Sequence, residues 1–171
     1  MRGTVVLSHG MESGPDATKV TAMAAAAVAL GWREVRPDYR DLDAQKTGPA
    51  LDERIARTIA AAPGDGSTVV FAGSSLGAFA SGLASLKRRC AGLFLLAPPL
   101  GIPGYPRVLD TAAVPLAIVH GWDDELIPAA DVIGFAAARR ARTYLVDDSH
   151  RLTAHVETIA RWFGEFLAEL P

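Results

Sequence analysis

Four short segments of the sequence combine serine, histidine and aspartate side chains with glycine. They are Ser8-His9-Gly10, Gly73-Ser74-Ser75-Leu76-Gly77, His120-Gly121-Trp122-Asp123-Asp124 and Asp147-Asp148-Ser149-His150. A hydroxyl, an imidazole and a carboxylate are the groups that nucleophilic catalysis uses as nucleophile, general base and orienting acid. The residue types therefore indicate such chemistry, provided that the fold brings the segments together.

The second segment is the most specific of the four. Residues 73–77 fit the pattern Gly-x-Ser-x-Gly, with Ser75 at the centre. This pattern is typical of a tight turn from a strand into a helix, which strains the central residue and exposes its hydroxyl, while larger side chains at Gly73 and Gly77 would collide with the neighbouring chain. A helix beginning at Leu76 would also direct free N–H groups towards a developing oxyanion. The pattern alone is a weak signal, because glycine and serine are common in turns.

The elements that must position these residues follow from the hydrophobic pattern. Runs typical of strands occupy 4–8, 34–38, 68–73, 92–97, 115–121 and 142–148, and helical patterns occupy 17–30, 50–62, 76–88 and 151–169. Strands that alternate with helices predict an α/β fold: a roughly six-stranded parallel sheet with helices on both faces. Ligands of such sheets bind beyond the carboxyl ends of the strands. All four segments are predicted to lie at that edge.

Composition limits the function classes. A chain of 171 residues with 50% apolar residues is predicted to form a single domain over residues 1–171, and is neither disordered nor fibrous. The net charge of −2 and the absence of a long basic run argue against nucleic acid and membrane partners. The single cysteine, Cys90, excludes an internal disulfide. Because the N-terminus does not resemble a signal peptide, we expect a cytoplasmic protein that acts on a small molecule.

The motifs together resemble those of the α/β-hydrolase family, and the resemblance covers nearly the whole chain. In that family the nucleophile, the acid and the histidine follow one another in this order, as Ser75, Asp124 and His150 do here. The segment "HGWDDELIP" is similar to the family pattern His-Gly-x-x-Asp-x-x-Val-Pro, with Ile127 in place of valine. The resemblance is to small, capless carboxylesterases and to dienelactone-hydrolase-like proteins, although the latter use a cysteine nucleophile.

The resemblance implies a serine hydrolase that cleaves carboxylic esters, or thioesters, of small molecules. Ser75 would attack the carbonyl carbon, His150 would accept and return the proton, and Asp124 would orient His150. The N–H groups of Leu76 and of Met11, the residue after His9-Gly10, would bind the oxyanion. This mechanism requires no metal and no cofactor.

Several assignments stay open at this level. Asp147 and Asp148 are close to His150 in the sequence, so either could cap the following helix or replace Asp124 as orienting acid. His9 and His120 are expected to have structural roles, as hydrogen-bond partners of loop backbone.

The longest irregular stretch, 98–114, is too short for a cap domain, and its side chains Leu100, Ile102 and Tyr105 would form one apolar wall of an open site. Trp122, beside the acid, is a candidate substrate contact. Amide or peptide hydrolysis is an alternative reaction, and a non-catalytic protein-binding module on the same scaffold is the alternative from another class. The oligomeric state does not follow from the sequence.

Overall fold

The computed structural model describes residues 1–45 and 50–171. Within these ranges, six parallel strands form one sheet in the order β2-β1-β3-β4-β5-β6. The strands are β1 (Thr4–Ser8), β2 (Arg33–Val35), β3 (Val69–Ser74), β4 (Gly92–Leu96), β5 (Leu116–Gly121) and β6 (Arg142–Val146). The α/β fold with a parallel sheet that the sequence predicts is thus confirmed.

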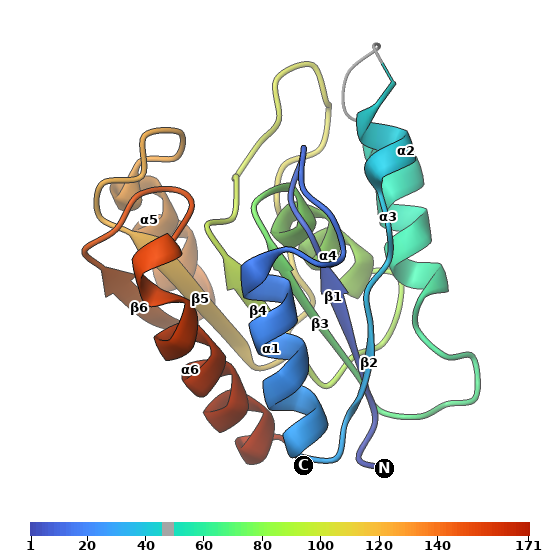
Figure 1. Cartoon of the computed structure of the whole chain (residues 1–171). Coiled ribbons are helices and arrows are strands. Elements are labelled where there is room, and N and C mark those ends of the chain that lie inside the picture. The colour runs from blue at the N-terminus through green and yellow to red at the C-terminus, as the bar shows by residue number, and fades with distance from the viewer. Residues whose placement is uncertain (46–49) are drawn as a thin grey trace.

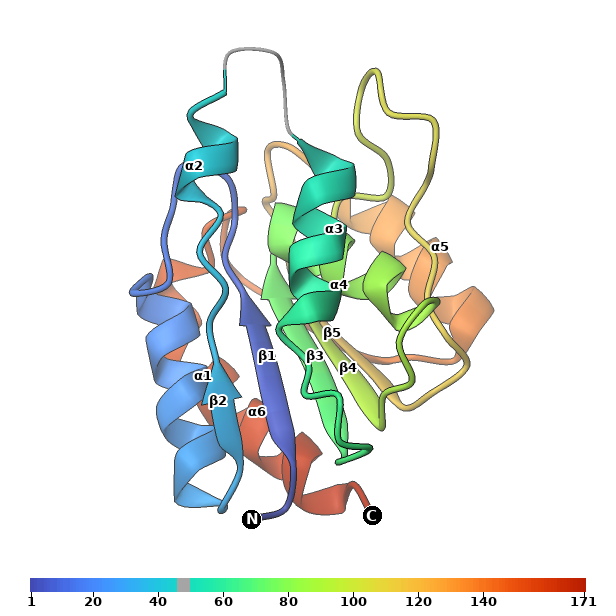
Figure 2. The same cartoon turned by 90° about the vertical axis from the view of Figure 1, so that its right-hand side faces the viewer.

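Helices cover both faces of the sheet (Figures 1 and 2). They are α1 (Thr18–Ala29), α2 (Arg40–Asp43), α3 (Leu51–Ala60), α4 (Leu76–Ser85), α5 (Ala129–Arg139) and α6 (Val156–Glu169), preceded by a 3₁₀ turn at Thr153–His155. Figure 1 shows α1 and α6 side by side on one face, and Figure 2 shows α3, α4 and α5 on the other. The chain therefore forms three layers.

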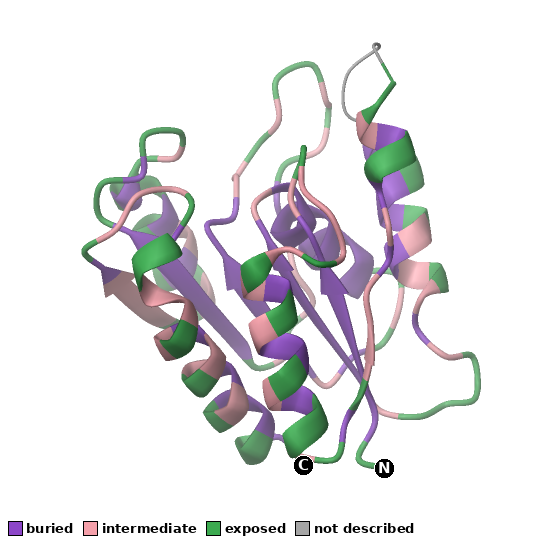
Figure 3. Ribbon diagram, in the orientation of Figure 1, coloured by how far each residue is buried: buried purple, intermediate pink, exposed green. Residues whose placement is uncertain are grey.

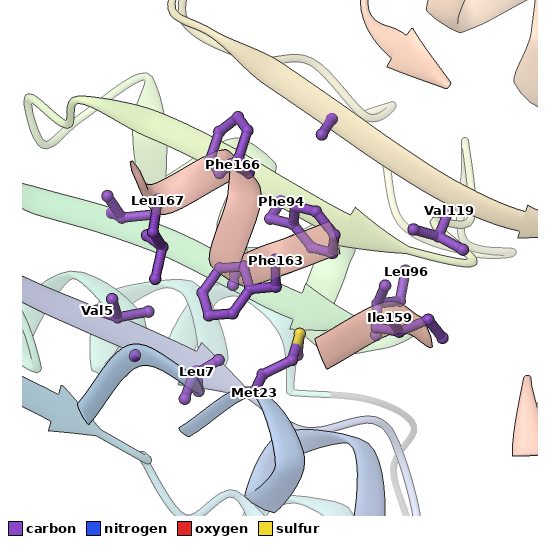
Figure 4. Close-up of a cluster of buried hydrophobic side chains, with 14 of the residues drawn as sticks. Val5, Leu7, Met23, Phe94, Leu96, Val119, Ile159, Phe163, Phe166 and Leu167 are labelled. Carbon is purple, nitrogen blue, oxygen red and sulfur yellow. The ribbon is translucent and has the colours of Figure 1, made fainter. Parts of the chain in front are cut away.

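The core has two parts, one on each face of the sheet. Every residue of β1, β3, β4 and β5 is buried, which Figure 3 shows as a continuous band through the sheet. On the α1/α6 face, Figure 4 shows Phe94 between Phe163 and Phe166, and its ring centroid is 5.0 Å from that of Phe163 and 5.6 Å from that of Phe166. Aromatic pairs at such distances are favourable beyond the apolar area that they bury. This face anchors the last helix to the sheet.

Two expectations about elements need correction. The helices α2 and α5 were not predicted. Between β4 and β5, residues 98–114 form an irregular loop, as expected. That loop closes on itself through a bridge between Gly101 and Val108. Tyr105 fixes it to α3 and α4, because its ring packs against Phe79 and its hydroxyl donates to Asp52 at 2.7 Å. The last helix begins at Val156 rather than at residue 151.

The strand order reverses between β1 and β3, and in open α/β sheets ligands generally bind beyond the carboxyl edge at such a point. Both chain ends lie at the opposite, amino edge, where Arg2 donates to the Leu170 carbonyl oxygen at 2.9 Å (Figure 1). None of the described helices combines the length and the apolar character needed to cross a membrane.

Candidate active site

Ser75 occupies the sharp turn between β3 and α4. Its backbone has φ 53° and ψ −117°, in the left-handed range of φ that non-glycine residues seldom adopt. Its N–H donates to the Leu96 carbonyl oxygen of the neighbouring strand at 2.8 Å, which holds the turn in place. A Cβ at Gly73 would overlap the Gly77 carbonyl, and one at Gly77 would lie 2.6 Å from the His9 carbonyl oxygen. Neither glycine therefore has room for a side chain.

Ser75, His150 and Asp124 form a continuous chain of hydrogen bonds. The Oγ of Ser75 lies 2.8 Å from Nε2 of His150, and Nδ1 of His150 lies 2.8 Å from Oδ2 of Asp124. Because a carboxylate only accepts, Nδ1 must carry the proton, so Nε2 accepts from the Ser75 hydroxyl. The Asp124 side chain is fully buried, whereas 12% of the His150 side chain is exposed. The His150 imidazole is therefore partly accessible to solvent, whereas the Asp124 carboxylate is not.

Asp124 is held in one orientation by the turn that follows it. Its Oδ1 accepts from the N–H groups of Leu126 at 2.9 Å and Ile127 at 2.8 Å. Oδ2, which faces His150, is also 3.4 Å from Nε2 of buried His120. The donor positions are fixed by backbone, so the carboxylate cannot rotate away from His150 without losing both bonds.

The other two aspartates near His150 make no contact with its ring. Asp148 accepts from the N–H groups of Ser149 and Ala154 and from Nδ1 of His155 at 2.8 Å. Burial raises the pKa of Asp148, but these hydrogen bonds outweigh it and leave the pKa below its usual range. Asp148 thus stabilises the segment before α6, but it is not the cap of that helix, whose N-cap residue is His155. Asp147 has no part in the hydrogen-bonded chain.

The loop after β1 lies against the serine. A Cβ at Gly10 would be 3.6 Å from the Ser75 Cβ, so the backbone of Gly10 borders Ser75. Leu76 is the first residue of α4, where a backbone N–H has no acceptor within the helix. Met11 is 45% exposed and Leu76 is buried, and their assignment as oxyanion donors stays a prediction.

Sequence reasoning did not foresee two further neighbours of the site. Glu125 accepts from the His150 N–H at 3.1 Å, and hydrogen bonds to its own backbone and to that of His150 lower the pKa of this carboxyl. Below the loop after β1, Arg54 donates to the His9 carbonyl oxygen at 2.9 Å and is 1% exposed. Because Arg54 is cationic and follows exposed residues of its helix, nothing in the sequence indicated that it would be buried.

The remaining expectations concern substrate contacts and ions. Leu100, Ile102 and Tyr105 pack against the core on the α3/α4 face, so their role as a substrate wall stays a prediction. Trp122 is 54% exposed beside Asp124. An open apolar hollow of about 530 Å³ between α1 and α6 includes no site residue. Among residues 1–45 and 50–171, no three His, Cys, Asp or Glu side chains are grouped as metal ligands would be.

Known structures provide an independent comparison. A candidate hydrolase of the α/β superfamily from Xanthomonas campestris pv. campestris is 50% identical, with 99% of this chain and 100% of the other covered and a TM-score of 0.94. A serine hydrolase without a lid from X. campestris is 22% identical, with 98% and 82% covered and a TM-score of 0.74. An esterase from Pyrococcus furiosus is 16% identical, with 99% and 83% covered and a TM-score of 0.77.

The two distant structures show the fold alone, whereas the first shares half of its residues with this chain. No protein-family model matches the sequence, and no curated protein does. Identity of 50% over nearly the full length of both chains shows that the two proteins belong to one family and do not merely share a fold. The chain belongs to the α/β-hydrolase superfamily.

Proposed function

We propose that the protein is a serine hydrolase that cleaves carboxylic esters, including thioesters, of small molecules through an acyl-enzyme on Ser75. The observation that carries this proposal is the unbroken chain from the Ser75 hydroxyl through His150 to Asp124, with 2.8 Å at each contact. Three groups with matched donors and acceptors at a strained turn are the arrangement that activates a weak nucleophile.

Each side chain has one role in the reaction. Ser75 Oγ attacks the carbonyl carbon as its proton moves to Nε2 of His150, and the carbonyl π electrons move to the oxygen. When the tetrahedral intermediate collapses, the bond to the leaving alcohol or thiol breaks and that group takes the proton from His150. Water then repeats the sequence on the acyl-enzyme, releasing the acid and restoring the Ser75 hydroxyl. Asp124 keeps the proton of neutral His150 on Nδ1 and stabilises the imidazolium.

The oxyanion would be bound by the N–H groups of Leu76 and Met11. Leu76 contributes from the first turn of α4, where the helix dipole also favours negative charge. Met11 contributes from the loop whose Gly10 borders Ser75. Loss of one such donor typically reduces kcat about 10²- to 10³-fold. Both donors belong to backbone, so substitutions that move the backbone are the way to test them.

The test is covalent labelling of the purified protein with a fluorophosphonate, followed by intact mass and peptide mapping. We expect one adduct, on Ser75, and none in Ser75→Ala. The matched control is Ser74→Ala, which makes the same change one residue earlier at a hydroxyl outside the hydrogen-bonded chain. Labelling of Ser74→Ala at the wild-type rate would show that the reactive hydroxyl is that of Ser75. If the folded wild-type protein is not labelled, the proposal is overturned in favour of a non-catalytic binding protein.

Substrate class is tested with a matched pair, para-nitrophenyl acetate and the corresponding anilide. We expect the ester and a thioester of the same acid to be hydrolysed with Ser75 dependence and the anilide to be resistant, because amide cleavage needs binding energy that a site without a cap does not supply. Preferential turnover of the anilide would replace the ester assignment with amide hydrolysis.

A further inference from the structure

A cluster of buried polar side chains lies beneath the loop after β1, and the proposed mechanism uses none of them. It links that loop to the segment before α2 and to α3. Its members are Ser8, His9, Tyr39, Asp43, Arg54 and Thr58. Polar groups are expensive to bury, so a cluster of this size next to a reactive site calls for an explanation.

Arg54 is the largest of the fully buried side chains. One nitrogen of its guanidinium donates to the His9 carbonyl oxygen at 2.9 Å, and another pairs with the carboxylate of Asp43. Its guanidinium carbon lies 4.4 Å from the centre of the Tyr39 ring. The rigid fork of a guanidinium fixes the direction of each of its hydrogen bonds. The His9 carbonyl therefore accepts a hydrogen bond from a charged donor, Arg54, whose orientation is fixed by its other contacts.

His9 transmits this constraint to the next peptide. The Tyr39 N–H, which can only donate, lies 3.0 Å from Nε2 of His9. Nε2 must therefore be the acceptor, and the proton of the neutral ring is on Nδ1, 2.7 Å from the Gly10 carbonyl oxygen. In a trans peptide the N–H points opposite to the carbonyl. The Gly10 carbonyl is drawn towards the imidazole, so the Met11 N–H points away from it.

The same loop is closed from the other side by the serine turn. The His9 carbonyl oxygen that Arg54 binds lies so near Gly77 that a Cβ there would be 2.6 Å from it. The adjacent Gly10 is in contact range of Ser75. Any shift of the His9 carbonyl therefore displaces the backbone that borders the nucleophile.

We propose that Arg54 is a positioning residue for the hydrolytic reaction: by holding the His9 carbonyl, it fixes the loop so that the Met11 N–H faces the oxyanion. The inference rests on the proposed function, because it concerns the oxyanion donors of that reaction. Arg54 contacts neither Ser75 nor His150, and it acts through the backbone of residues 9–11.

The test compares Arg54→Met with Arg88→Met. Arg88 also donates to a backbone carbonyl, that of Pro63 at 2.5 Å, but far from Ser75 in the fold, so its variant controls for loss of an arginine–carbonyl bond. The endpoint of fluorophosphonate labelling counts active sites, so that kcat and KM for para-nitrophenyl acetate refer to folded enzyme. A trifluoromethyl ketone, whose adduct with Ser75 carries an oxyanion, reports the oxyanion donors directly.

For Arg54→Met we expect kcat per active site to fall roughly 10- to 100-fold with KM unchanged, since small misplacement of a donor has effects of this size. The inhibition constant of the trifluoromethyl ketone should rise by the same factor, and Arg88→Met should stay within about twofold of wild type in all three quantities. A merely structural role would instead reduce the number of active sites and leave kcat per site and the ketone affinity unchanged, which would overturn the proposal.

Two milder variants serve if Arg54→Met does not fold. Arg54→Lys keeps a charge and a donor, and Asp43→Asn weakens the anchor of Arg54 while leaving its bond to His9. Both should show the same coupled change in kcat and ketone affinity, of about 3- to 10-fold, and wild-type values in both would contradict the proposal. If the wild-type protein itself is neither labelled nor active, the proposed function fails and the positioning role falls with it.

Discussion

The ends of β1 and β5 carry the same dipeptide, His9-Gly10 and His120-Gly121, but use it differently. Both imidazoles are fully buried and both bind a loop carbonyl, that of Gly10 at 2.7 Å and that of Ile127 at 2.9 Å. His9 uses its second nitrogen to accept from Tyr39, whereas the Nδ1 of His120 has no hydrogen-bond partner in the described part of the chain. His9 thus joins two segments of backbone, whereas His120 lies beside the Asp124 carboxylate.

Each histidine also has an aspartate nearby, and these two carboxylates should differ most in their effect on activity. Asp124 lies 3.4 Å from Nε2 of His120 and binds His150, whereas Asp38 lies 3.9 Å from Nε2 of His9 and pairs with exposed Arg40. Asp124→Asn should lower kcat about 10⁴-fold, because the amide favours the wrong tautomer of His150. Asp38→Asn should change kcat less than about twofold. Steady-state ester hydrolysis measures both, and equal effects would remove the distinction between the two strand ends.

Replacement of Gly121 by alanine should destabilise the protein more than replacement of Gly10. A Cβ at Gly121 would overlap the Asp148 carbonyl and lie 2.8 Å from that of Ser149, whereas one at Gly10 would be 3.3 Å from the Ser74 carbonyl oxygen. We expect Gly121→Ala to lower the free energy of unfolding by roughly 2–3 kcal/mol and Gly10→Ala by less than about 1 kcal/mol. Urea denaturation gives both values, and the reverse order would show that the loop after β1 is the tighter of the two.

Asparagine and glutamine can separate the two ring nitrogens. The asparagine amide occupies roughly the place of Nδ1 and the glutamine amide that of Nε2, so His9→Asn and His120→Gln should each keep the bond to the loop carbonyl. The opposite exchanges, His9→Gln and His120→Asn, should lose it and cost about 1 kcal/mol more in the free energy of unfolding. Thermal or urea unfolding of the four variants tests this, and a preference for the same amide at both positions would contradict the assigned contacts.

The smallest expected effect is on pH dependence. Burial, together with the nearby Arg54 charge, lowers the pKa of His9 below 6.5 although its bond to Gly10 acts the other way. The unfolded chain then binds more protons than the native protein below pH 6.5, so stability is complete above that pH and is lost on acidification. Because the pKa of Asp38 is about 2, Asp38 does not contribute in this range. His9→Asn should therefore lose less unfolding free energy than the wild type as the pH falls below 6.5.

The sequence predicted well what local patterns determine. Residues 4–8 form β1 as expected, and the continuously apolar runs at 92–97 and 115–121 contain β4 and β5. The family pattern placed the acid at Asp124, and Asp124 contacts His150. Helix α5 was missed because Gly134 interrupts its pattern and Pro128 precedes it, although proline is compatible with a helix start.

Long-range polar contacts could not be predicted. Arg54 follows Asp52 and Glu53 in a helix whose apolar residues recur every four positions, so it resembled part of a solvent-exposed face. Its burial depends on Asp43 and the His9 carbonyl, which come from distant parts of the chain. The loop at 98–114 was expected as an irregular stretch, but its attachment to α3 through Asp52 depends on the completed fold.

The position of the two chain ends has a practical consequence. Both lie at the amino edge of the sheet, joined by the contact between Arg2 and the Leu170 carbonyl, whereas Ser75, Asp124 and His150 lie at the carboxyl edge. A fusion partner or a linker to a solid support can therefore be attached at either end while the edge that carries Ser75 faces the bulk solution. The same arrangement makes the protein suited to display on a bead or an electrode, with its substrate-facing side directed away from the surface.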